Sequence, residues 1–177
     1  MLETRRLSVR PFVDSDYPRL LELRHHPEVG KYLGGSDIPA ERVASRLKYY
    51  LDHYERWGYG MGVVSLKPDP YMIGFGGLQH LDDSEEVEVG YAFDRAYWGQ
   101  GFATELAAGW VEYGFNQLGL DRIVAVAYPE NTASRHVMEK LGMRYEKNVF
   151  HYGHECVYYA VGRDEFSPAG AGGLRRS

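Results

Sequence analysis

Two glycines stand two positions apart in the stretch YWGQGFATEL, residues 97–106, where a strand pattern gives way to a helical one. Glycine costs a helix about 1 kcal/mol relative to alanine, so Gly99 and Gly101 need a reason at a helix start. The first amides of a helix lack intrahelical acceptors, and the helix dipole adds positive charge there. Without Cβ atoms, a ligand can approach these amides closely. The stretch therefore predicts an anion site, most often one for phosphate, with a plain tight turn as the alternative.

The residues around the glycines, and the cysteine and histidines elsewhere, argue against nucleotide-binding loops, a disulfide and a metal site. No Gly-Lys-Ser/Thr follows the glycines, and Thr104 stands where a dinucleotide-binding pattern needs a third glycine. Cys156 is the only cysteine, which rules out an intramolecular disulfide, and we interpret it as a packing residue. Histidine pairs occur at 25–26 and in HYGH, 151–154, but neither has a cysteine partner or a helical spacing of four. We expect no metal site.

Composition sets the protein class. The chain has 177 residues, 44% of them apolar and 25% charged, as in one soluble globular domain. Its formal charge of −5 argues against a nucleic-acid partner, which needs a basic face, and mildly favours a cationic partner such as an amine. The chain lacks a signal-peptide pattern and a membrane-spanning stretch. These features predict a cytoplasmic protein that binds no membrane.

Hydrophobic periodicity indicates the elements that must position the glycine turn. Asp14 can cap a helix that Pro27 ends. Strands are expected at about 2–12, 60–66, 71–81, 85–93, 120–128, 143–149 and 155–163, with further helices at about 39–56, 102–118 and 130–142. The strands between 60 and 93 should form an antiparallel meander, and the second half should hold a parallel element. We expect one mixed α/β domain over 1–166 and a disordered tail over 167–177.

Two motifs together carry a family resemblance. GYAFDRAYWGQGFATELA (90–107), followed by PENTASRHVMEKLGM (129–143), resembles the GNAT superfamily of N-acetyltransferases. The RimJ/RimL-like branch, which acetylates N-terminal amines of ribosomal proteins and related substrates, is the most similar. The likeness runs from LETRRLSVRPF through YYAVGRDEF, nearly the whole chain. It implies a mostly antiparallel sheet with a parallel pair splayed around acetyl-CoA and helices on both faces.

The resemblance also implies how acetyl-CoA is held. The family pattern Arg/Gln-x-x-Gly-x-Gly/Ala places Gly101 and Ala103 at its fourth and sixth positions, while Trp98 replaces the first residue. A strand end should pair with the pantetheine arm and offer one N–H to the thioester oxygen. Asn131 matches the family asparagine that bonds pantetheine. The implied cofactor-binding residues are Tyr91, Ala92, Phe93, Trp98, Gly99, Gln100, Gly101, Phe102, Ala103, Thr104, Asn131 and Ser134.

Proton transfer has two candidates. Ser134 shares a helix face with Asn131 and could protonate or hydrogen-bond the leaving thiolate, or it could be an ordinary helix serine. Many relatives carry an acid tyrosine where this chain has Met138, which cannot donate a proton. Glu88, in EEVEVGYAF (85–93), is the candidate general base, because carboxylates on this strand serve so in other family members. Glu85, Glu86 and Glu88 could instead form a solvated face.

The acceptor amine is the least specified part. By the resemblance, loops at about 25–38 and 148–155 border its cleft, so His25, His26, Tyr32 and His151 are candidates to line it, unless they are surface residues. An α-amine, with a pKa near 7.7–8, is more often neutral than a lysine amine and fits a weak base better. We expect direct attack on acetyl-CoA by a peptide or protein N-terminus. A polyamine, aminoglycoside or other small amine, or a non-catalytic acyl-CoA sensor, remain alternatives, and a homodimer is possible.

Overall fold

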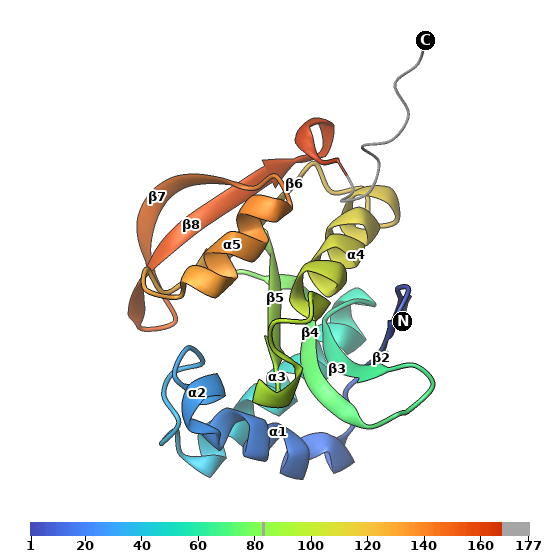
Figure 1. Cartoon of the computed structure of the whole chain (residues 1–177), viewed down its shortest axis with the longest axis vertical. Coiled ribbons are helices and arrows are strands. Elements are labelled where there is room, and N and C mark those ends of the chain that lie inside the picture. The colour runs from blue at the N-terminus through green and yellow to red at the C-terminus, as the bar shows by residue number, and fades with distance from the viewer. Residues whose placement is uncertain (83, 168–177) are drawn as a thin grey trace.

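The computed structural model describes residues 1–82 and 84–167 and shows a single sheet with helices on both faces (Figure 1). The eight strands of this sheet lie in the order β1-β2-β3-β4-β5-β6-β8-β7. They are β1 (Leu2–Glu3), β2 (Leu7–Pro11), β3 (Met61–Leu66), β4 (Met72–His80), β5 (Val87–Phe93), β6 (Arg122–Ala127), β7 (Arg144–His151) and β8 (His154–Gly162). The helices are α1 (Tyr17–His25), α2 (Pro27–Gly30), α3 (Ala40–Trp57), α4 (Phe102–Asn116) and α5 (Thr132–Lys140). Mixed α/β architecture is confirmed.

The N-terminal segment differs from the expectation in two ways. The single strand expected within 2–12 is a hairpin, because Thr4 turns the chain between β1 and β2: its amide donates to the Leu7 carbonyl (2.9 Å) and its hydroxyl accepts from the Leu7 amide (3.0 Å). Asp14 does not cap a helix with its side chain; it starts a 3₁₀ turn, and α1 begins at Tyr17. Asp16 instead accepts the Val13 amide (2.9 Å) and pairs with Arg10.

The expected meander and parallel element are both present. Strands β3, β4 and β5 pair antiparallel in sequence order, and β5 and β6 form the one parallel pair among the described strands. That pair matches only Glu88 with Val124, so β5 runs on to Phe93 without β6 beside it. The end of β5 is therefore unpaired on one side, immediately before the glycine turn.

Alternation along β5 separates two faces of the sheet. Val89 belongs to the large apolar cluster with α4 residues such as Leu106 and Trp110, whereas Ala92 packs on the cluster that α1 and α3 form over β3 and β4. Side chains of successive strand residues thus point to different helical layers. No helix of the described residues is long and apolar enough to cross a membrane. The tail expected at 167–177 lies, apart from Ser167, outside the described residues.

Candidate active site

The glycine turn joins β5 to the N-terminus of α4. Gly99 and Gly101 have φ of +73° and +80°, a left-handed backbone that side chains rarely adopt, and Gly101 is the N-cap of α4. A Cβ at Gly99 would meet no atom within 4 Å, so the space beside the turn is open. Within the described residues, the first amide past the turn with an acceptor belongs to Glu105, which donates to the Gly101 carbonyl (3.0 Å). The amides of 99–104 thus fit a diphosphate group.

Arg6 supports this turn from the start of β2, and nothing in the local pattern predicted it. Its guanidinium donates to the Gln100 carbonyl (3.1 Å) and to Glu105 Oε2 (2.6 Å), and it lies over the Phe102 ring at 4.3 Å. The Arg6 amide also donates to Glu105 Oε1 (2.8 Å). Trp98 secures the other side, because its indole N–H donates to the Phe93 carbonyl (2.8 Å). These contacts fix the turn to the segment before β2 and to the end of β5.

The end of β5 offers backbone groups to the gap beside it. The Asp94 amide donates to Ile73 in β4 (2.8 Å), and the register pairs Phe75 with Ala92, so the backbone of Ala92 faces β4. By alternation, the amides of Tyr91 and Phe93 face the gap. Of the three strand residues predicted to bind the cofactor, Tyr91 and Phe93 therefore have amides that face the gap, whereas the Ala92 amide does not.

Asn131 and Ser134 lie at the start of α5, opposite the β5 end. Asn131 Oδ1 accepts the Ser134 amide (3.1 Å) and so caps α5. The hydroxyl of Tyr91 lies 3.2 Å from Ser134 Oγ, and burial raises the pKa of Tyr91 to about 12 although the contact with Ser134 opposes this. Met138 is buried in the core. The phenol of Tyr91 thus lies beside Ser134, a contact that the sequence did not reveal.

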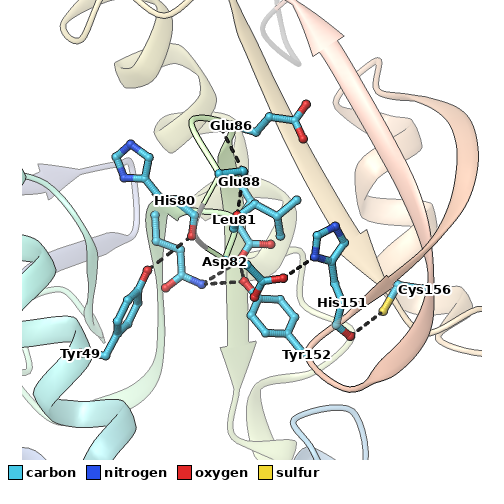
Figure 2. Close-up of polar contacts among 11 residues, drawn as sticks. Tyr49, His80, Leu81, Asp82, Glu86, Glu88, His151, Tyr152 and Cys156 are labelled. Carbon is cyan, nitrogen blue, oxygen red and sulfur yellow. Dashed lines mark hydrogen bonds and ion pairs between the residues drawn. The ribbon is translucent and has the colours of Figure 1, made fainter.

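Glu88 is not part of a solvated face, because its side chain is buried, with 4% of its surface exposed. Gln79 Nε2 donates to Glu88 Oε1 at 2.7 Å, and the hydroxyl of Tyr152 donates to the same oxygen (Figure 2). Burial raises the pKa of Glu88 to about 7, against the lowering effect of these two hydrogen bonds. A carboxyl group half ionised near neutral pH suits a general base.

Tyr152 comes from the turn between β7 and β8, which folds back over Glu88. Its φ of +54° is left-handed, and Gly153 follows with +81°. His151 pairs with Asp82, and Figure 2 shows both beside the Tyr152 ring. Gln79 also donates to the Tyr152 hydroxyl (3.3 Å), while its own Oε1 is buried without a partner in the described residues. His151 thus positions the turn that carries Tyr152. Tyr152 itself was not among the residues predicted from the sequence.

The remaining acceptor candidates, His25 and Tyr32, make contacts other than with Glu88. His25 is exposed and its Nε2 contacts the Ile38 carbonyl (2.8 Å), which ties α1 to the loop that follows α2. Tyr32 of that loop has its ring 6.0 Å from the Tyr128 ring at the end of β6. Cys156 is buried, in keeping with a packing role. No group of three or more metal-binding side chains occurs in residues 1–82 and 84–167.

The chain is similar in sequence and fold to known proteins. A family model described as "Acetyltransferase (GNAT) domain" matches residues 6–144. "Uncharacterized N-acetyltransferase YnaD" of Bacillus subtilis is 30% identical over 173 residues, 94% of this chain and 99% of its own. A GNAT-family acetyltransferase structure from Bacillus anthracis has a TM-score of 0.76 at 28% identity, covering 93% of this chain and 99% of that one. Mycobacterium smegmatis RimJ in complex with CoA-disulfide has a TM-score of 0.70 at 22% identity, covering 92% and 88%.

Proposed function

Because the chain belongs to the GNAT acetyltransferase family, we propose that it acetylates an α-amine, with the N-terminus of a peptide or protein as the favoured acceptor. Family membership makes the protein an acetyl-CoA-dependent N-acetyltransferase, which confirms the enzyme class and cosubstrate predicted from the two motifs. The observation that carries the choice of acceptor is the buried Glu88, with its pKa near 7.

The glycine turn and the end of β5 would hold the donor. Acetyl-CoA supplies an activated acetyl thioester. The amides between Gly99 and Thr104 would bind its diphosphate at the N-terminus of α4. The amides of Tyr91 and Phe93 would pair with the pantetheine arm, and one of them would donate to the thioester oxygen as negative charge develops there, an effect worth about 3 kcal/mol in other acyl transfers. Asn131 would bond the same arm with its side-chain amide.

Glu88 would take the proton of the attacking amine. Since the Tyr152 hydroxyl donates to Glu88, it can accept a proton from the amine while passing its own to the carboxylate. The amine nitrogen bonds to the acetyl carbon, the carbon–sulfur bond breaks, and the thiolate takes a proton from Ser134. Tyr91 can restore the proton to Ser134, 3.2 Å away. The neutral amine thus gives one proton to Glu88, and sulfur gains one through Ser134 and Tyr91. Exchange with water then returns Glu88 and Tyr91 to their starting protonation states.

The acceptor preference follows from matching pKa values. An α-amine titrates near 7.7–8.0, so about a tenth of it is neutral at pH 7, whereas a lysine side chain is almost wholly charged. A base with a pKa of about 7 can deprotonate the first far more readily than the second. The site therefore favours α-amines.

The test follows thiol release from acetyl-CoA with a panel of amines. Peptides with free Ser or Ala N-termini should stimulate release. The same peptides with blocked N-termini and one lysine should not, and spermidine should be poor. Faster release with spermidine or with the lysine peptide would refute the α-amine preference. Tight CoA binding without release by any amine would indicate a sensor.

A further inference from the structure

The side of Glu88 that faces α3 carries positive charge. Arg46 of α3 is half-buried, and its guanidinium lies 5.6 Å from the ring centres of both Tyr49 and Tyr152. Because the Tyr152 hydroxyl bonds Glu88, Arg46 stands one side chain away from the candidate base. Arg42 lies one helical turn before Arg46, on the same face of α3.

A third arginine, Arg24 of α1, is buried, and the charges of Arg46 and Arg42 act on it. Only 6% of its surface is exposed; its Nη2 donates to the Leu33 carbonyl (2.6 Å), and its Nε has no partner in the described residues. Burial lowers the pKa of Arg24, and Arg46 and Arg42 lie close enough to lower it further. In the part of the chain that the structure describes, no carboxylate lies within 4 Å of any of the three.

Such a cluster is unfavourable unless an anion joins it. A buried charge without a counter-charge destabilises a protein by several kcal/mol, and like charges nearby add to this. Glu88 neutralises the cluster only in part, because it is half protonated near pH 7. The protein's net charge of −5 therefore does not describe the α3 side of this site, where Arg46 and Arg42 concentrate positive charge, while Asp82 brings a carboxylate from the loop between β4 and β5.

We propose that the acceptor amine carries a carboxylate, which Arg46 binds with Arg42 and Arg24 beside it. The inference rests on the proposed function and names its substrate class. The same positive field lowers the pKa of the bound amine, so that more of it is neutral and able to attack. A polyamine or aminoglycoside, which carries several positive charges and no anion, is repelled. The carboxylate can be the α-carboxylate of a free amino acid or an acidic side chain near a peptide N-terminus.

Pairs of acceptors with and without one carboxylate distinguish a free amino acid from a peptide with an acidic side chain. The free amino acid serine is compared with serinamide, and the peptide Ser-Asp-Ala-Ala-amide with Ser-Asn-Ala-Ala-amide, at saturating acetyl-CoA. Since a charge-assisted hydrogen bond strengthens binding substantially, the acidic member of at least one pair should have a kcat/KM about tenfold higher or more. Equal use of both members in both pairs overturns this inference and leaves the α-amine proposal intact. Acetylation of no amine overturns both.

Variants on α3 test the arginine directly. Arg46→Gln should reduce the preference for the acidic acceptor to about twofold or less, with the dissociation constant of acetyl-CoA unchanged. Lys48→Gln is the matched control, because Lys48 is exposed on another face of α3 and pairs with Asp52 (2.9 Å); it should keep the full preference. If Arg46→Gln does not fold, the exposed Arg42→Gln should still weaken the preference. A full preference in a folded Arg46→Gln or Arg42→Gln protein overturns the assignment.

Discussion

Replacing Glu88 by glutamine removes one buried group that ionises. The effect of this change on the free energy of unfolding can be calculated from the pKa of Glu88. An unperturbed glutamate ionises near pH 4.5, but Glu88 in the folded protein ionises near pH 7 because it is buried. Between these values the unfolded chain has lost a proton that the folded chain keeps. The contribution of Glu88 to the free energy of unfolding is therefore full below pH 4.5, falls by about 1.4 kcal/mol per pH unit, and levels off above pH 7. The total loss is about 3 kcal/mol.

The free energy of unfolding of the Glu88→Gln variant lacks this decrease between pH 4.5 and pH 7. Urea unfolding of both proteins from pH 4 to 8.5 should show the free energy of unfolding of Glu88→Gln rising by about 3 kcal/mol relative to the natural protein, with other groups cancelling in the difference. Parallel curves would mean that Glu88 ionises normally, and the argument for a base near neutrality would be refuted. With an α-amine acceptor at pH 8, the variant should also lose about 10²–10⁴-fold in kcat.

Other changes test the remaining parts of the site. Gly101→Ala should weaken CoA binding about tenfold or more, because a side chain is disfavoured at its φ of +80° and its Cβ would lie 3.6 Å from the Arg6 guanidinium that supports the turn. Gly58→Ala, at a similarly left-handed φ of +73° away from the site, should share only the cost of about 1 kcal/mol in stability, and calorimetric titration with CoA compares the two variants. Ser134→Ala should lower kcat about tenfold or more while CoA affinity stays within about twofold, and unchanged turnover would remove Ser134 from the mechanism. Tyr152→Phe removes a hydrogen bond that lowers the pKa of Glu88, so the acidic limb of the pH–rate profile should move to higher pH; an unmoved limb would separate Tyr152 from the base.

Local sequence patterns were sufficient where neighbouring residues decide the structure. Alternation along 87–93 put Glu88 and Tyr91 on opposite faces of a strand, and Gly99 with Gly101 indicated the open turn before α4. Each of these features depends on backbone preferences within about ten residues, which a single sequence contains.

Contacts between distant segments were not predictable in the same way. Tyr152 reaches Glu88 across 64 positions and Arg6 reaches Glu105 across 99, and no local preference encodes either meeting. The side-chain hydrogen bond of Thr4 similarly divided a segment whose alternation indicated one strand. The raised pKa of Glu88 was unpredictable for the same reason, because it depends on burial by a turn from the far end of the chain.

The bond between Arg6 and Glu105 also has a consequence for folding. Arg6 is synthesised almost a hundred positions before its partner Glu105, and closing so long a loop costs more entropy than a local contact. The turn that we propose to bind the donor is thus completed only after the two halves of the chain have met. On that proposal, a newly made chain that still lacks its second half does not hold CoA, however well its first strands have formed.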